Sequence, residues 1–385
     1  MPTTQKNTQN SPEQENATTI FLCAGGTGGH MFPAIALAED LKARGYRPVV
    51  LSDKRGLAYI DEGDMEVVTI PSSSLQGGAM AKLSGLFSLA CGYLKTLSLI
   101  GRYKPALAIG FGGYPSLPSM MAAQHRHIPT IIHEQNAVIG KANAFLAPKA
   151  DRIAVSYASM TGLDEVDRIR AVVTGNPVRG EISKLYSDAY TPLSETGHFN
   201  ILVMGGSQGA LVFGEVVPTA LAGLSDEQRS RIQVVQQCLP ADQEKIEDTY
   251  NAADIQFKLH QFISDIAGEL KKAHLIIGRS GATTVAEITT AGRPAIFVPY
   301  PHHKDQQQAI NAEAVAEQGG AWMMLETGFT SDALKTKIET FFHNPQSLFD
   351  AAEAARGLAR PDAARKLGNL ITALASGWDH SGGKV

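Results

Sequence analysis

The sequence predicts an α/β protein built from two parallel-sheet domains. The chain has 385 residues, which is enough for two domains of ordinary size. Hydrophobic residues make up 44 % of it and charged residues 19 %, so the chain can bury large cores. Strand-like apolar runs alternate with helix-like stretches, and a strand followed by a glycine-rich turn and a helix occurs twice.

The first half has the spacing of successive βαβ units. A strand over 19–24 leads into the glycine-rich turn Gly25–His30, and a helix is expected from Pro33 to Arg44. The other elements expected in this half are strands over 48–51, 66–70, 106–109 and 130–132 and a long helix over 80–100. Such alternation is typical of a parallel sheet.

The pattern breaks over 175–198, a stretch that contains Pro177, Pro192 and Gly197, and then restarts. A strand over 200–204 runs into a second glycine-rich turn, and more strands are expected over 233–235, 255–257, 275–277 and 295–298, followed by helix over 331–375. We therefore expect two Rossmann-like domains facing a central cleft. The expected divisions are a disordered polar tail over 1–17, an N-terminal domain over 18–178, a linker over 179–198, a C-terminal domain over 199–356 and a C-terminal helix over 357–377 that returns to the first domain.

Composition and charge exclude several classes of protein. A net charge of −4 and a pI of about 6.3 argue against general nucleic-acid binding, which depends on neutralising phosphates. Cys23, Cys91 and Cys238 are far apart in apolar runs, so neither a disulfide framework nor a zinc site is expected. The N-terminus lacks the apolar core of a signal peptide, and no stretch of 18 uncharged apolar residues occurs, so no membrane span is expected.

The charge is unevenly distributed along the chain. Residues 18–178 carry 15 Lys and Arg against 12 Asp and Glu, a net of +3, whereas residues 179–385 carry 18 against 24, a net of −6. Either this asymmetry arises by chance, or the basic front half faces something anionic.

A stripe of apolar residues at helical spacing runs through 79–104. Its members are Leu83, Leu86, Phe87, Ala90, Leu94 and Leu97, and the cations that flank it are Lys82, Lys95, Arg102 and Lys104. We expect most of these leucines to be buried on the sheet. The alternative is a surface that seats on anionic lipid headgroups.

The turn Gly25–His30 is a candidate phosphate site, because glycines let the backbone approach an anion and the next helix presents free N–H groups. It matches neither GxxxxGK[ST] nor GxGxxG, so a nucleotide-binding P-loop is not expected, although Asp53 keeps a nicotinamide-dependent dehydrogenase open as an alternative. The helix dipole disfavours imidazolium at His30, which makes this residue a candidate general base near neutral pH. The alternative is a capping or core histidine.

A second candidate site is the run Gly278–Glu287. A strand ends there and a helix is expected to begin near Ala282, whose N–H groups can hold a diphosphate. Glu287 can accept hydrogen bonds from a ribose diol, unless it only interacts with the helix dipole. The glutamines at 306–308 can read sugar hydroxyls, because an amide both donates and accepts. No Asp-x-Asp occurs, so the usual Mg²⁺ or Mn²⁺ site of a glycosyltransferase has no obvious ligands.

Several motifs together resemble a known family. They are GGTGGH at 25–30, GFGGYPS at 110–116, HEQN at 133–136, GNPVR at 175–179, GGSQGA at 205–210, RSGATTVAE at 279–287 and HKDQQQAIN at 303–311. In order and spacing they resemble the MurG family of peptidoglycan N-acetylglucosaminyltransferases, over about residues 18–375.

This resemblance implies the two-domain GT-B glycosyltransferase fold. It implies an inverting, metal-independent transfer of GlcNAc, without a cofactor, from UDP-GlcNAc to the C4 hydroxyl of the muramyl sugar of lipid I, which gives lipid II. It also implies a peripheral protein on the cytoplasmic face of the inner membrane, where it contacts anionic lipid and serves cell-wall biogenesis, cell shape and division together with cell-wall synthesis proteins.

The resemblance also implies roles for particular residues. Thr27, Gly28 and Gly29 would line the diphosphate cleft, and His30 would be the general base. The expected donor-binding residues are Asn136, Arg179, Ser207, Ile263, Ala282, Thr283, Thr284, Val285, Ala286, Glu287, Gln307, Gln308 and Asn311. Among these, Ser207 would lie at the phosphates, Ile263 would meet uracil through its backbone and Glu287 would bind the ribose.

The chain departs from the family pattern at Gln236-Gln237-Cys238-Leu239, where many relatives carry His-Gln-Ser/Thr-Gly. Three alternatives stay open beside the transferase. A UDP-GlcNAc 2-epimerase-like enzyme would convert the nucleotide sugar without an acceptor, a dehydrogenase would transfer hydride, and a binding module would hold UDP-GlcNAc without releasing UDP.

Overall fold

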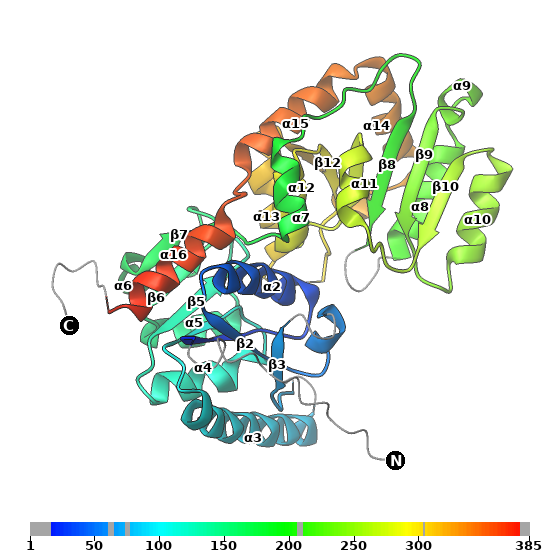
Figure 1. Ribbon diagram of the computed structural model, residues 1–385. Coiled ribbons are helices and arrows are strands. Elements are labelled where there is room, and N and C mark those ends of the chain that lie inside the picture. The colour runs from blue at the N-terminus through cyan, green and yellow to red at the C-terminus, as the bar shows by residue number, and fades with distance from the viewer. Residues whose placement is uncertain (1–16, 61–64, 74–77, 206–210, 303–304, 378–385) are drawn as a thin grey trace. The chain divides into compact units, whose positions relative to one another are not determined.

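The computed structural model describes residues 17–60, 65–73, 78–205, 211–302 and 305–377 (Figure 1). The expected polar tail over 1–17 therefore lies almost entirely outside the described residues. The chain divides into two compact units. The first comprises Met1–Gln135, Ile139–Pro177 and Asp362–Val385, and the second comprises Asn136–Val138 and Val178–Pro361.

The first unit contains a sheet of seven parallel strands in the order β3-β2-β1-β4-β5-β6-β7. These are β1 (Thr19–Cys23), β2 (Arg47–Ser52), β3 (Glu66–Thr69), β4 (Leu107–Gly110), β5 (Thr130–Glu134), β6 (Arg152–Val155) and β7 (Ala171–Val173). The central strands β1, β4 and β5 are buried along their whole length, because both faces of the sheet are covered. The strand order reverses between β1 and β4, and this is the switch point at which open α/β sheets bind ligands.

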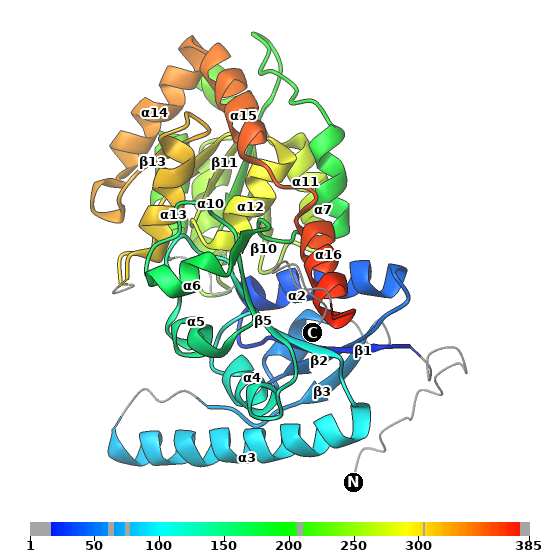
Figure 2. The ribbon, with the colours of Figure 1, turned by 90° about the vertical axis from the view of Figure 1, so that its left-hand side faces the viewer.

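Helices cover both faces of this sheet. They are α2 (Gly28–Ala43), α3 (Ala79–Tyr103), α4 (Ser116–His125), α5 (Lys141–Leu146), α6 (Glu165–Ile169) and α16 (Ala363–Ala375), with the short 3₁₀ helices η1 (Gly56–Tyr59) and η2 (Ala147–Lys149). α16 lies beside α2 although more than 300 residues separate them in sequence (Figure 2). The Arg44 side chain donates to Asn369 Oδ1 at 2.8 Å and to the carbonyl oxygen of Arg365 at 3.0 Å. The last helix is thus part of the first unit.

The burial of α3 differs from the expectation for its leucines. The large apolar residues of the stripe are exposed: Leu83 by 70 %, Leu86 by 56 %, Phe87 by 71 % and Leu94 by 63 %. The reason is at Gly92, where a Cβ would lie 2.3 Å from the carbonyl oxygen of Pro71. Only a residue without a side chain fits at this point, so the face of the helix that carries Gly92 and the buried Thr96 turns inward, and the large side chains on the other face turn out.

α3 also differs from the expectation of no membrane-length segment. Within the described ranges it is the one helix long and apolar enough to cross a membrane by length and composition alone, with a mean hydropathy of 1.4 in Lys82–Tyr103. Its inner face nevertheless belongs to the core of the first unit, where Leu99 and Ile100 pack with Phe21 and Met120. Figure 2 shows it alongside α4.

The second unit repeats the strand order of the first. Its sheet has six parallel strands in the order β10-β9-β8-β11-β12-β13, so that the switch point lies between β8 and β11. These are β8 (Phe199–Met204), β9 (Ile232–Gln237), β10 (Gln256–His260), β11 (Leu275–Gly278), β12 (Ala295–Phe297) and β13 (Ala321–Met323). The strands expected in this half are all present, and β13 is additional.

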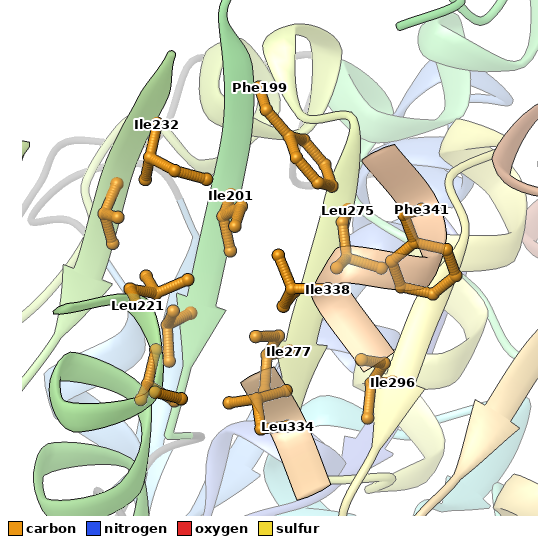
Figure 3. Packing of buried hydrophobic residues seen from close by; sticks show 14 of the residues in the cluster. Phe199, Ile201, Leu221, Ile232, Leu275, Ile277, Ile296, Leu334, Ile338 and Phe341 are labelled. Carbon is orange, nitrogen blue, oxygen red and sulfur yellow. The ribbon is translucent and has the colours of Figure 1, made fainter. Parts of the chain in front are cut away.

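Alternate residues of these strands face two separate cores. Phe199, Ile201 and Ile277 pack on one face against Leu334 and Ile338 (Figure 3). The helices of the unit are α7 (Gly180–Lys184), α8 (Leu211–Ala222), α9 (Asp226–Arg229), α10 (Gln243–Ala252), α11 (Ile266–Lys272), α12 (Ala282–Ala291), α13 (Gln307–Ala316), α14 (Ser331–His343) and α15 (Gln346–Leu358), with η3 (Leu185–Ser187) and η4 (Glu326–Gly328).

Residues 179–198, which the sequence suggests as a linker, are folded into the second unit. Ile182 of α7 and Leu185 of η3 are buried in one of its cores, and Tyr190 and Leu193 are buried in the other. Proline and glycine mark this stretch as irregular, but its apolar side chains still have a core to fill.

Candidate functional site

The first glycine-rich turn is braced by a single carboxylate. Asp53 Oδ1 accepts hydrogen bonds from the backbone N–H of Gly26 at 3.2 Å and of Gly56 at 3.0 Å, while Oδ2 accepts from Arg55 Nε at 2.7 Å. Asp53 is 6 % exposed. Because its oxygens hold the turn, Asp53 is not presented to a ribose. The acidic residue that kept the dehydrogenase alternative open is thus explained by its structural role.

A second glycine turn, after β4, packs against the first. Gly112 and Gly113 have φ of +84° and +76°, a backbone conformation that residues with a Cβ rarely adopt. A Cβ on Gly113 would lie 3.2 Å from the carbonyl oxygen of Gly25 and 3.3 Å from Nε2 of His30. The GFGGYPS motif is therefore needed to bring the main chain close to the His30 ring.

His30 lies in the first turn of α2, which begins at Gly28, with Thr27 at the N-cap. Burial is the largest influence on this imidazole and lowers its pKa below 6.5, while Glu134, Gln135 and the carbonyl of Phe111 act in the opposite direction. Its Nδ1 lies 3.3 Å from Oε1 of Gln135. The ring is therefore neutral at pH 7, as a general base must be before it takes a proton.

The end of β5 supplies the groups that surround His30. His133 and Gln135 are buried and bonded to each other, with Gln135 Nε2 at 3.0 Å from His133 Nδ1. Glu134 Oε2 accepts from Asn143 Nδ2 at 2.8 Å and from the N–H of Gly140 at 2.9 Å. Only Asn136 of the HEQN motif was among the expected site residues. The missed signal is a run of four polar residues that begins inside the fully buried strand β5 and continues past its end.

In the second unit, α12 begins at Ala282 with Gly281 at its N-cap, at the end of β11. The expected residues Ala282, Thr283 and Val285 are buried, whereas Thr284 and Ala286 are half-buried. The first N–H groups of this helix have no partners within the helix, so its N-terminus is suited to an anion.

Glu287 lies on this helix and is 4 % exposed. Arg179 donates to it twice, from Nε at 3.1 Å and from Nη2 at 2.9 Å, and both bonds end on Oε1. Burial raises the pKa of the Glu287 carboxyl, and Arg179 opposes this rise. The two residues that the resemblance places at the ribose and the nucleotide thus form one buried ion pair.

Asn311 on α13 is fully buried and uses both ends of its amide. Its Oδ1 accepts from the N–H of Ala137 at 3.0 Å, and its Nδ2 donates to Asn136 Oδ1 at 3.1 Å and to the carbonyl oxygen of Ser280 at 3.2 Å. Asn311 therefore holds Asn136 and the β11–α12 turn in place, instead of offering an unoccupied amide.

The two expected glutamines of α13 are both half-buried. Gln308 Oε1 accepts from the N–H of Tyr300 at 3.0 Å, and its carbonyl oxygen accepts from Ser280 Oγ at 2.7 Å. Gln307 is the first residue of the helix. This corner of the unit is therefore built from residues of the RSGATTVAE and HKDQQQAIN motifs together.

Two further expected contacts lie near the ends of β8 and β10. Ser207 lies outside the described residues, as do Gly206 and 208–210. Ile263 is 9 % exposed and packs into the core, which leaves its backbone as the part available to a ligand. Gln237 bridges the two strand ends, because its Oε1 accepts from the N–H of Gly205 and its Nε2 donates to the carbonyl oxygen of Gln261.

The sequence departure at 236–239 leaves this bridge intact. Gln236 stands where many relatives have histidine, and it is fully buried between the hydroxyl of Tyr250, at 2.6 Å, and the carbonyl oxygen of Phe213. It therefore has a role in the core. Among the described residues, no group of three or more His, Cys, Asp and Glu side chains is arranged to hold a metal ion.

Two parallel-sheet units, each with a helix N-terminus at its switch point, are the architecture of the GT-B fold. Residues 20–155 match the glycosyltransferase family 28 N-terminal domain, and residues 200–367 match the C-terminal domain of the same family. The chain is 46 % identical over 92 % of its length, and 94 % of the relative's, to the UDP-N-acetylglucosamine--N-acetylmuramyl-(pentapeptide) pyrophosphoryl-undecaprenol N-acetylglucosamine transferase of Rhodospirillum centenum. It belongs to glycosyltransferase family 28 and, within it, to the MurG family.

Solved structures agree with this assignment. The crystal structure of MurG from Acinetobacter baumannii is similar with a TM-score of 0.74 and 29 % identity, over 92 % of this chain and 99 % of that one. A crystal structure of UDP-N-acetylglucosamine 2-epimerase has a TM-score of 0.64 at 13 % identity, over 96 % of this chain and 99 % of that one. The second likeness shows the shared fold alone.

Proposed function

We propose that this protein transfers GlcNAc from UDP-GlcNAc to the C4 hydroxyl of the muramyl sugar of lipid I, with inversion at the anomeric carbon and without a metal. The observation that carries the proposal is the buried Arg179–Glu287 pair beside the N-terminus of α12. It combines a carboxylate for a diol with N–H groups for a diphosphate, which are the two recognition elements of a nucleotide sugar.

On the donor side, both bonds from Arg179 end on Glu287 Oε1, so Oε2 would accept from the ribose hydroxyls. The start of α12, from Ala282 to Ala286, would hold the diphosphate with Ser207. The backbone of Ile263 would meet uracil. Asn136, Gln307 and Gln308 would read the GlcNAc hydroxyls, and Asn311 would act by holding Asn136 in place.

On the acceptor side, Thr27, Gly28 and Gly29 would receive the diphosphate of lipid I at the start of α2. His30 would take the proton of the attacking hydroxyl. The acceptor oxygen then forms a bond to the anomeric carbon from the face opposite UDP, and the bond from that carbon to UDP breaks with its electron pair on the diphosphate. The positive end of α12 would stabilise this growing charge.

The domain organisation in this proposal follows the charge asymmetry. The N-terminal domain over 18–178 would take the acceptor and face the membrane, and the C-terminal domain over 199–356 would take the donor, with the helix over 357–377 returning to the first. The outer face of α3 would seat peripherally on anionic lipid of the inner membrane, because its exposed leucines and Phe87 are flanked by Lys82, Lys95 and Arg102. Cell-wall synthesis proteins would be further partners.

One assay separates the candidate activities. Radiolabelled UDP-GlcNAc is incubated with the full chain and a lipid I analogue, with and without EDTA. We expect label in the lipid product, with release of UDP, in both arms. Conversion of UDP-GlcNAc without acceptor would indicate an epimerase, whereas binding of UDP-GlcNAc with no transfer would indicate a binding module. Activity lost in EDTA and restored by a divalent cation would contradict the metal-independent mechanism.

A further inference from the structure

A series of hydrogen bonds connects the His30 ring with the backbone. It runs from the His30 ring through Gln135 and the ring of His133 to the carbonyl oxygen of Gly175, and all four residues belong to the first unit. His133 and Gln135 are 0 % and 2 % exposed. Because water does not compete at His133 and Gln135, their bonds to each other and to Gly175 decide which of their atoms carry protons, and the half-buried His30 ring is reached through Gln135.

This series of hydrogen bonds ends at the carbonyl oxygen of Gly175, a group that can only accept. His133 Nε2 lies 3.0 Å from the carbonyl oxygen of Gly175, so this nitrogen carries a proton. Burial lowers the pKa of His133 to about 4, and the ring is therefore neutral at pH 7. A neutral imidazole has one N–H, so Nδ1 of His133 has a lone pair and accepts.

The amide of Gln135 is oriented by two acceptors. Its Nε2 lies 3.0 Å from His133 Nδ1 and 3.2 Å from the carbonyl oxygen of His133. Exchanging the two ends of the amide would set an oxygen against both acceptors, so the nitrogen stands there. Oε1 therefore faces His30 Nδ1 at 3.3 Å and can only accept from it.

We propose that Gln135 and His133 are positioning residues that set the tautomer of His30, with the proton on Nδ1 and the lone pair on Nε2. Nε2 is the atom that borders Gly113, where the chain has no side chain to cover it. A base oriented by a neighbour in this way follows the logic of catalytic triads, here with an amide in place of a carboxylate. Which tautomer His30 adopts does not depend on the proposed function. Only the use of His30 as a base rests on that function.

The neutral amide suits this position. Two titratable groups lie near His30 at the end of β5. Glu134 acts on the ring directly, and His133 is connected to it through Gln135. Glu134 and the carbonyl of Phe111 favour the imidazolium, whereas burial, the larger influence, favours the neutral ring. Gln135 orients the ring without adding a second negative charge, which would raise the pKa of His30 further.

The direct test is the tautomer in the unmodified protein. The full chain is labelled with ¹⁵N-histidine, and the ring nitrogens are observed by NMR at pH 7.5, with His30→Ala and His133→Ala spectra used for assignment among the 11 histidines. We expect a proton on Nδ1 of His30 and on Nε2 of His133. A proton on Nε2 of His30 would overturn the proposal.

Gln135→Leu tests the consequence for turnover. We expect the His30 signals to shift toward the other tautomer and kcat to fall about 10- to 100-fold, the range known for outer partners of metal-bound imidazoles, with the KM for UDP-GlcNAc little changed. The matched control is Gln124→Leu, which removes a half-buried amide of the same unit that donates to the carbonyl oxygen of Leu146 at 3.0 Å. Unchanged tautomer and kcat in folded Gln135→Leu would contradict the proposal.

Gln135→Glu is a second variant of nearly the same shape. A carboxylate facing Nδ1 stabilises the imidazolium, so the acidic limb of the kcat profile should move to higher pH by about one to three units. An unmoved limb would count against the contact between Gln135 and His30. If the unmodified chain transfers no GlcNAc, the proposed function fails while the NMR result stands. If it transfers GlcNAc but His30 carries its proton on Nε2, only the present inference fails.

Discussion

Each of the two units has a helix N-terminus at its switch point, but the central side chain there is neutral in the first unit and charged in the second. In the first unit the central group is His30, a neutral ring held by the amide of Gln135. In the second unit it is Glu287, a buried carboxylate paired with Arg179. The difference agrees with the proposed roles, because a base must be neutral before it reacts, whereas a group that only holds a diol can stay charged and paired.

The largest expected effect is the loss of the base from the first unit. His30→Ala should lower kcat by about 10²–10⁴-fold, the usual contribution of general-base catalysis, and should leave UDP-GlcNAc affinity nearly unchanged because the donor residues lie in the second unit. Steady-state kinetics and calorimetric titration with UDP-GlcNAc measure the two quantities. Turnover close to that of the unmodified protein would remove His30 from this role.

Acid should destabilise the first unit through His133. The unfolded state takes up a proton near pH 6.5, but the folded state does so only near the lowered pKa of about 4, so more protons are bound by the unfolded chain between these values. The free energy of unfolding should therefore fall as the pH drops from 6.5 to 4, by about 3 kcal/mol from this residue.

The measurement is chemical denaturation at pH 7 and pH 4.5 for the unmodified chain and for His133→Gln. The pH dependence should be smaller in the variant, which has no group to protonate there. An equal dependence in both proteins would assign the acid sensitivity to other groups, of which His274, with its pKa also lowered to about 4, is the first to examine.

In the second unit, breaking the ion pair should affect binding more than turnover. Glu287→Gln should weaken UDP-GlcNAc binding by about 10- to 150-fold, corresponding to about 1.5–3 kcal/mol for hydrogen bonds to a charged group. Glu181→Gln is the matched control, since Glu181 also contacts Arg179, at 3.6 Å, but its side chain is 55 % exposed. Equal affinities of the two variants would contradict the proposed ribose contact.

The smallest expected effect concerns α3, whose exposed apolar face has no counterpart on α11, the helix that precedes β11 in the second unit. Lys95→Gln should weaken binding to vesicles with anionic lipid by about fivefold, from about 1 kcal/mol per basic residue near the surface. Lys42→Gln makes the same change on α2, which packs on the other face of the sheet, and should have no effect. Co-sedimentation with vesicles at low salt measures the binding of both variants. Equal losses of binding would indicate that the charge asymmetry arises by chance.

Much of the fold could be predicted because local pattern and tertiary structure agree. Continuous apolar runs such as 19–24 and 275–277 are buried strands of parallel sheets, and the glycine turns that follow them lie at the ends of these strands. The additional strands β6, β7 and β13, of three or four residues each, were not expected from the sequence. The helix α2 starts five residues before the expected Pro33, which lies inside it.

Candidate site residues can be named from the sequence where a motif has its own backbone signature, and cannot be named where only tertiary contacts bring them in. Glu287 and His30 could be named from their places after glycine-rich turns. The bond from Gln135 to His30 spans 105 residues of sequence, and the bond from His133 to Gly175 spans 42, so neither has a local pattern. Asn311 was expected to read a sugar, but its full burial and its bonds to Asn136 and Ala137 became visible only in the fold.

The sequence by itself determined the α/β class, the two parallel sheets and the family, because these depend on periodicity, on glycine at turns and on motifs that are contiguous. Tertiary structure alone decided that Asp53 braces a turn, that Leu83, Leu86 and Leu94 face outward and that 179–198 is folded into the second unit. It also brought Gln135 to the ring of His30. The physical reason is that burial, close approach and hydrogen-bond partners are properties of the space around a residue, and distant segments of the chain create that space.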